Sequence, residues 1–116
     1  MQQNDPFYLW KQYAFNKKQE NEINRNKTIT NVCDALRRLS KKYDWDQLYI
    51  FGSLIKQEAF TKYSDIDIGI SGLNKFDHFS FVADLSGIVG RDVDVELLEY
   101  SDFSDKIIKS GMQWKK

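Results

Sequence analysis

Residues 47–70 read QLYIFGSLIKQEAFTKYSDIDIGI, and this segment is the most informative part of the chain about its fold. Its first five residues, Gln47–Phe51, form a largely apolar run that is typical of a buried strand, and Gly52-Ser53 ends this run. Residues 65–70 (DIDIGI) alternate strictly, which predicts a second strand with aspartates on one face and isoleucines on the other. The stretch therefore places a Gly-Ser turn and a pair of carboxylates on two short strands.

The flanking sequence supplies helices and a third strand. Apolar spacing predicts helices over residues 28–42 and 75–89, a short helix over 54–60 and a last helix that begins at Ser101-Asp102. Alternation predicts a strand over Asp92–Leu98, and residues 112–114 can add a short edge strand. The order α-β-α-β-α-β-α indicates an α/β (α+β) fold, in which helices flank a small mixed sheet of three to four strands.

The chain is expected to form one domain, residues 28–116, preceded by an N-terminal helical arm, residues 1–27. The arm either continues into the next helix or breaks near Asn26. Its aromatic segment, residues 6–15, contains Phe7, Tyr8, Leu9, Trp10, Tyr13 and Phe15. Because aromatic residues are enriched at interfaces, one hypothesis is that this segment docks on a partner protein or a second copy. The alternative is that the segment folds back onto its own sheet.

The composition excludes several classes of protein. Of the 116 residues, 41% are hydrophobic and 15% are aromatic, which favours a folded core over a disordered chain. No apolar run approaches the ~20 residues of a membrane helix, and the N-terminus lacks the features of a secretory signal. The single cysteine, Cys33, excludes an internal disulfide framework. We therefore expect a cytoplasmic protein with no membrane partner.

The charge is unevenly distributed although the net charge is zero. Residues 63–100 carry eight acidic and two basic side chains, whereas residues 1–62 carry seven acidic and eleven basic ones. A neutral chain is not expected to bind nucleic acid directly. The acidic middle is either a solvated surface or a centre that binds cations.

Three features of the sequence point to phosphate chemistry. Gly52 allows close approach of the backbone, and Ser53 at the start of a helix can donate a hydrogen bond to a phosphate. Asp65 and Asp67 leave the same face of a strand, so they can hold a hard cation such as Mg²⁺. Asp94 in the third strand would add the charge needed for two metal ions, which suit an in-line displacement at phosphorus.

The motif F-G-S…S-D-I-D-I followed by V-D-V resembles the DNA polymerase β-type nucleotidyltransferase superfamily over about residues 28–111. The chain is similar in size to the minimal nucleotidyltransferases (MNT proteins), which are paired with HEPN-domain proteins in prokaryotes. The resemblance implies a fold like the polymerase β palm, two Mg²⁺ ions and ATP as substrate. It assigns catalysis and metal binding to Asp65, Asp67 and Asp94, and nucleotide binding to Gly52, Ser53 and Lys56. Lys56 is included because Leu54-Ile55-Lys56-Gln57 stands where the family often has Arg-x-Arg-Gly.

The resemblance also implies a function. The chain would transfer AMP from ATP to a hydroxyl, expected to be a tyrosine, of a partner HEPN ribonuclease toxin, and would thereby act as the antitoxin. One alternative is a nucleotidyltransferase with a small-molecule acceptor, whose site a partner subunit completes. Another is a non-catalytic antitoxin that binds its toxin by contact alone. The acceptor site is expected to need another molecule, so a homo-oligomer or hetero-oligomer is compatible with either reading.

Overall fold

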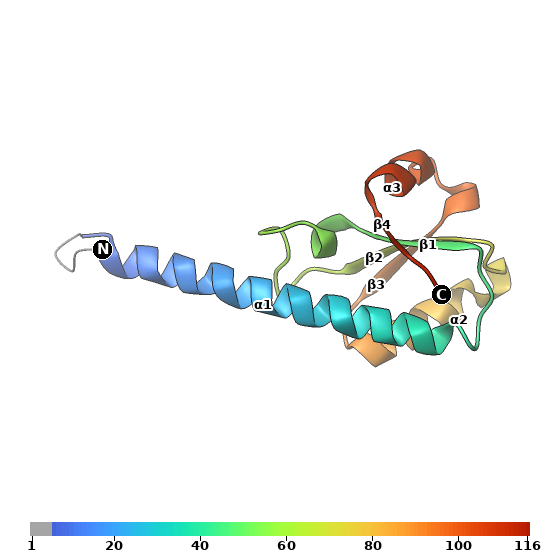
Figure 1. The fold of residues 1–116 in the computed structure, drawn as a ribbon, viewed down its shortest axis with the longest axis horizontal. Coiled ribbons are helices and arrows are strands. Elements are labelled where there is room, and N and C mark those ends of the chain that lie inside the picture. The colour runs from blue at the N-terminus through green and yellow to red at the C-terminus, as the bar shows by residue number, and fades with distance from the viewer. Residues whose placement is uncertain (1–5) are drawn as a thin grey trace.

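The computed structural model describes residues 6–116, which form a mixed sheet flanked by helices (Figure 1). The helices are α1 (Tyr8–Leu39), α2 (His78–Val89) and α3 (Ser104–Ser110). The strands are β1 (Gln47–Phe51), β2 (Ile66–Ser71), β3 (Val93–Leu97) and β4 (Met112–Trp114). None of the helices in this part of the chain is long and apolar enough to cross a bilayer.

The four strands lie in the order β3-β2-β1-β4. β1 pairs antiparallel with both β2 and β4, whereas β2 pairs parallel with β3. The parallel pair is possible because α2 carries the chain back across the sheet between its two strands. This arrangement confirms the expected mixed sheet, including the short edge strand at residues 112–114, and it is consistent with the polymerase β-like nucleotidyltransferase fold.

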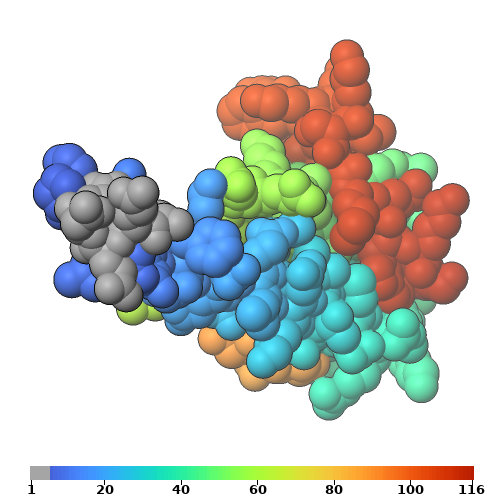
Figure 2. Space-filling model, turned by 60° about the vertical axis from the view of Figure 1, so that its left-hand side comes forward, coloured from blue at the N-terminus to red at the C-terminus, as the bar shows by residue number. Residues whose placement is uncertain are grey.

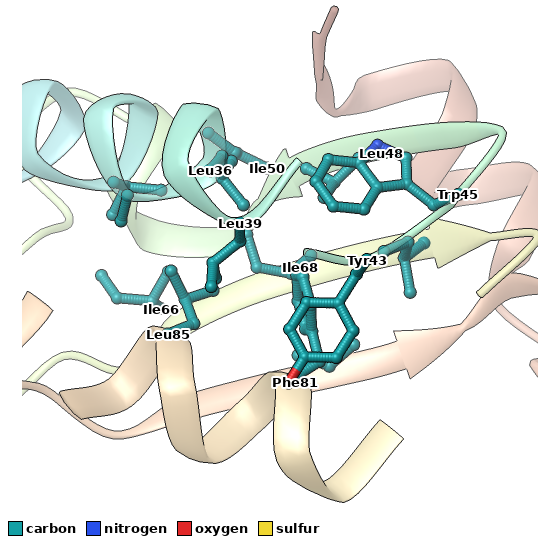
Figure 3. Close-up of a cluster of buried hydrophobic side chains, with 14 of the residues drawn as sticks. Leu36, Leu39, Tyr43, Trp45, Leu48, Ile50, Ile66, Ile68, Phe81 and Leu85 are labelled. Atoms are coloured by element: carbon teal, nitrogen blue, oxygen red, sulfur yellow. The ribbon is translucent and has the colours of Figure 1, made fainter. Parts of the chain in front are cut away.

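The main core lies between one face of the sheet and helices α1 and α2 (Figure 3). Its fully buried members alternate along the strands and recur at helical spacing in α1 and α2, as burial on one face requires. They include Leu36, Leu48, Ile50, Ile66, Ile68, Phe81 and Leu85. Phe81 also contacts the rings of Tyr43 and Trp45 edge to face, at centroid distances of 5.4 and 5.8 Å. This core fixes the sheet, so the opposite face can carry polar groups.

Helix α3 covers one end of that opposite face, where Tyr49, Leu98 and Ile107 form a second small cluster. Gly69 in β2 makes the contact possible, because a Cβ at this position would come within 2.8 Å of the Ile107 side chain. The Leu98 side chain would be almost as close, at 3.0 Å from the same point. The rest of this face, towards the start of β2 and β3, carries the acidic side chains.

Helix α1 is continuous through Asn26, so the arm and the next predicted helix are one element. It ends at Leu39 and not at residue 42, because the following residues form turns. Its N-terminal part extends beyond the sheet, and the molecule measures 61 × 27 × 21 Å along its principal axes (Figure 1). The aromatic segment does not fold back onto the sheet, since Leu9 and Trp10 are 78% and 66% exposed.

The helix predicted over residues 54–60 is wrong. The chain forms a 3-10 helix at Gly52–Ile55, called here the Gly–Ser turn, and then an irregular loop. The main-chain carbonyl of Leu54 accepts a hydrogen bond from Arg25, and Glu58 adopts a left-handed φ of 67°, so an α-helix cannot continue. The last helix also starts later than predicted, at Ser104, because the Ser101 hydroxyl accepts a hydrogen bond from the Phe103 amide in a tight turn.

Candidate active site

Two of the predicted acidic residues lie side by side on neighbouring strands. Asp67 in β2 is the register partner of Asp94 in the parallel strand β3, so both side chains leave the same face of the sheet. Glu96 follows two residues further along β3 on this face, and Asp65 stands directly before β2. We call Asp65, Asp67, Asp94 and Glu96 the acidic cluster. Three of its members were predicted as site residues, and the register now shows why Glu96 joins them.

The acidic cluster repels itself electrostatically. The pKa of Asp67 is raised above its ordinary value, first because the carboxyl is partly buried and then because of the negative charges of Asp94, Asp65 and Glu96. The ionised form of Asp67 is therefore disfavoured at this place in the fold. A bound cation would remove this disadvantage, since it would offset the neighbouring charges.

The donor set fits Mg²⁺ in its chemistry, because carboxylate oxygens are the ligands that this hard cation prefers. Nevertheless, within residues 6–116 no three His, Cys, Asp or Glu side chains stand close enough together to hold one ion as they lie. The ligand set is thus not preformed in the protein alone. Among the described residues, Asp65, Asp67 and Asp94 could hold Mg²⁺ only together with ligands from a bound molecule.

The Gly–Ser turn packs directly against the acidic cluster. Phe51, at the end of β1, is the register partner of Asp67, so the next residue, Gly52, lies beside the Asp67 carboxylate. Gly52 has a left-handed φ of 79°, and a Cβ at this position would overlap with Oδ2 of Asp67. Glycine is therefore required twice, for its conformation and for the close approach. Ser53 follows and is half-buried, and its hydroxyl has no hydrogen-bond partner among the described residues.

Arg25 in α1 holds the Gly–Ser turn in place, a role that no pattern in the sequence indicated. Its Nη1 donates a 3.0 Å hydrogen bond to the main-chain carbonyl of Leu54. Glu22, one turn earlier in α1, fixes the guanidinium through bonds of 2.9 and 2.6 Å and has its pKa lowered by this contact. The side chain of Arg25 is only 11% exposed, so the contact is shielded from solvent. A long-range pair of this kind leaves no local pattern in the sequence.

Arg91 holds the loop that leads to Asp65 by hydrogen bonds to its main chain, as Arg25 holds the Gly–Ser turn. Its Nη1 donates to the main-chain carbonyls of Thr61, Lys62 and Ser64, the last at 2.9 Å. The guanidinium also lies over the ring of Phe60, 4.5 Å from its centroid. Arg91 therefore fixes the loop from the start of the β3 strand, which carries Asp94.

A hollow of about 290 Å³ opens between the Gly–Ser turn, the sheet and α3. On the surface, the α3 region (orange to red) lies next to the yellow-green loop that follows the Gly–Ser turn (Figure 2). Of the predicted residues, Gly52, Lys56 and Asp94 line it. Asp65 instead lines a separate hollow beside Arg91, on the other side of the loop. We call the first space the α3 hollow. Its remaining lining residues are Phe51, Ile55, Glu96, Phe103, Lys106, Ile107 and Ser110.

The site thus combines a glycine turn with register-paired aspartates on a mixed sheet. The family model described as "Polymerase beta, Nucleotidyltransferase" matches residues 34–113. The match covers more than half of the chain, so this chain belongs to the polymerase beta nucleotidyltransferase family. Comparisons with curated proteins and with solved structures gave no match.

Proposed function

We propose that the chain is a Mg²⁺-dependent nucleotidyltransferase that transfers AMP from ATP to a hydroxyl group of a partner HEPN ribonuclease toxin, and so acts as its antitoxin. The observation that carries the enzymatic part is the register pairing of Asp67 with Asp94, with Gly52 packed against the Asp67 carboxylate. The raised pKa of Asp67 supports a role for this cluster beyond stability, because uncompensated carboxylates are costly unless they bind a cation.

In the proposed reaction the acceptor hydroxyl oxygen attacks the α-phosphorus of ATP, a new P–O bond forms, and pyrophosphate leaves. Mg²⁺, when bound, would neutralise phosphate charge and lower the pKa of the attacking hydroxyl. Asp94, which is exposed and lines the α3 hollow, accepts the proton of that hydroxyl. Gly52 lets the phosphates approach the backbone, while Ser53 and Lys56 donate hydrogen bonds to them.

The proposed acceptor is a protein, and the aromatic segment supports this choice. Its side chains at Leu9, Trp10, Tyr13 and Phe15 are each more than half exposed. Residues 6–19 contain three lysines and no acidic residue. Such a surface matches a partner with an apolar groove and an acidic rim, and aromatic anchors of this kind carry much of the energy in protein interfaces. We therefore propose that this segment binds the toxin and that a tyrosine of the toxin receives AMP.

Labelled ATP tests the proposal directly. The protein is incubated with Mg²⁺, with the HEPN protein encoded beside it, and with ATP labelled either at the α- or at the γ-phosphate. Label from the α-phosphate should appear on the partner, label from the γ-phosphate should not, and the double variant Asp65→Asn/Asp67→Asn should transfer neither. Binding of the partner without any transfer would favour a non-catalytic antitoxin. Transfer to a small molecule alone would overturn the protein acceptor.

A further inference from the structure

The α3 hollow is lined by both apolar and charged side chains. Its apolar lining comes from three different elements: Phe51 from β1, Ile55 from the Gly–Ser turn, and Phe103 with Ile107 from the α3 region. The charged side chains in its lining are Lys56, Asp94, Glu96 and Lys106. A concave apolar space with a few polar groups at its rim is the usual form of a small-molecule site.

One face of the α3 region is directed at this hollow. Phe103, Lys106, Ile107 and Ser110 follow the i, i+3, i+4, i+7 spacing of a single helix face, and all four line the space. Ile107 is buried against Tyr49 and Leu98, so it anchors the helix. Phe103 is 65% exposed although it is a large aromatic side chain. The Phe103 ring therefore lines the hollow but is not buried in the core, so it remains accessible to a ligand.

The position of the hollow relative to the acidic cluster indicates what it would hold. Gly52 and Lys56, the residues proposed to contact phosphates, form one side of it, and Asp94 forms another. In a nucleoside triphosphate the nucleoside is joined to the α-phosphate, which must lie beside Asp94 for transfer. We propose that the α3 hollow binds the nucleoside of the donor nucleotide, with the base against the Phe103 ring. This inference rests on the proposed function and names the second half of its substrate site.

The polar groups of α3 can hydrogen-bond to the edge of a base. Ser110 donates its hydroxyl proton to the main-chain carbonyl of Lys106, at 2.7 Å, so its oxygen is left as an acceptor. The Lys106 ammonium can only donate. Together they match a base edge that offers a donor beside an acceptor, which adenine, cytosine and uracil all do, so these two groups do not select among the bases.

Calorimetry with two probes tests the proposal. Mg²⁺–ATP and Mg²⁺–tripolyphosphate are titrated into the wild-type protein, into Phe103→Ala and into Phe76→Ala, a control variant of another exposed phenylalanine ring that does not line the hollow. Phe103→Ala should weaken ATP binding about tenfold, the loss expected for one base–aromatic contact. It should leave tripolyphosphate binding unchanged, and Phe76→Ala should change neither.

The outcomes separate this proposal from the proposed function. If the wild-type protein binds no ATP, the proposed function fails. If it binds ATP but Phe103→Ala binds ATP equally well, or loses both ligands equally, only the nucleoside site is overturned. Photolabelling of the wild-type protein with 8-azido-ATP provides an independent check. Label should map to peptides that contain residues 51–56 or 103–110, and label confined to other peptides would also overturn the proposal.

Discussion

The carboxylate of Asp67 lies directly against the Cα of Gly52, so that the glycine turn and the acidic cluster form one packed unit. The contact joins the last residue of β1 to the beginning of β2, where Phe51 and Asp67 are register partners. Any side chain at position 52 would both push this carboxylate away and strain a backbone with a φ of 79°. The conformation of the Gly–Ser turn, the proposed phosphate site, therefore determines where the carboxylate of Asp67, a proposed metal ligand, lies.

Gly52→Ala should for this reason impair stability and ligand binding together. We expect a loss of about 1 kcal/mol or more in the free energy of unfolding from the left-handed backbone. Mg²⁺–ATP binding should fall further than this loss explains. Gly87→Ala is the matched control, because a Cβ there meets nothing within 4 Å and the residue is helical. Denaturant unfolding and calorimetry measure the two effects, and normal ATP binding by the alanine variant at position 52 would contradict the argument.

Asp67→Asn should stabilise the protein at neutral pH in the absence of metal. The pKa of Asp67 is raised in the folded state, so the folded protein binds the proton more tightly than the unfolded chain does. The stability that this group contributes is present below its ordinary pKa and is lost as pH rises through the higher folded-state value. The variant should therefore melt a few degrees higher than the wild type at pH 7, and the difference should disappear near pH 3.

The melting temperatures of the wild type and of Asp67→Asn should also be compared in the presence of Mg²⁺. Mg²⁺ should raise the melting temperature of the wild type at pH 7 and have a smaller effect on Asp67→Asn. Asp105→Asn, an exposed acid of α3, should behave as the wild type in both experiments. A melting temperature for Asp67→Asn below that of the wild type at pH 7 would mean that the acidic cluster is not repulsive.

Ser53→Ala should affect ligand binding and leave the fold intact. The Ser53 hydroxyl has no hydrogen-bond partner among the described residues, so its removal leaves no protein group unsatisfied. We expect a change in unfolding free energy within about 0.5 kcal/mol and a clear loss of affinity for Mg²⁺–tripolyphosphate. Unfolding curves and calorimetry provide the measurements. Unchanged affinity in a stable variant would remove Ser53 from the phosphate site.

Arg25→Met should weaken nucleotide binding although Arg25 is not proposed to touch the nucleotide. The substitution removes the hydrogen bond to the Leu54 carbonyl and leaves Glu22 unpaired, so it should cost about 1–2 kcal/mol of stability. The Gly–Ser turn then loses its anchor on α1. Lys27→Met, an exposed position on the same helix, is the control. Equal loss of ATP affinity in both variants would show that a change of charge, and not the anchor, is responsible.

Deletion of residues 1–15 should separate partner binding from nucleotide binding. The aromatic segment lies beyond the contacts that tie α1 to the sheet and the Gly–Ser turn, so its removal should leave Mg²⁺–ATP affinity unchanged. Affinity for the HEPN partner, or self-association, should fall strongly. Pull-down and analytical ultracentrifugation measure these effects. Full partner affinity and an unchanged oligomeric state would show that docking lies elsewhere.

The sequence predicted the parts of the site that depend on local alternation. The pattern DIDIGI placed Asp67 on one face of a strand, and VDV did the same for Asp94, because side-chain direction has a period of two. Their pairing as neighbours depends on the strand order, which the pattern does not encode. The helix predicted over residues 54–60 failed for a related reason. Arg25 donates a hydrogen bond to the Leu54 carbonyl from 29 residues away in the sequence. A rule based on local spacing cannot predict such a contact.

Because α1 is a single unbroken helix, it sets a fixed distance between the aromatic segment and the sheet. Fifteen residues separate Arg25 from Trp10, which corresponds to roughly 22 Å at the usual rise of a helix. A molecule that grips the aromatic segment and also presents a hydroxyl beside Asp94 has to bridge a span of that order. A free metabolite cannot reach both ends, whereas a folded protein of ordinary size can. If the aromatic segment docks the acceptor as proposed, the length of α1 therefore favours a protein over a small molecule as the acceptor.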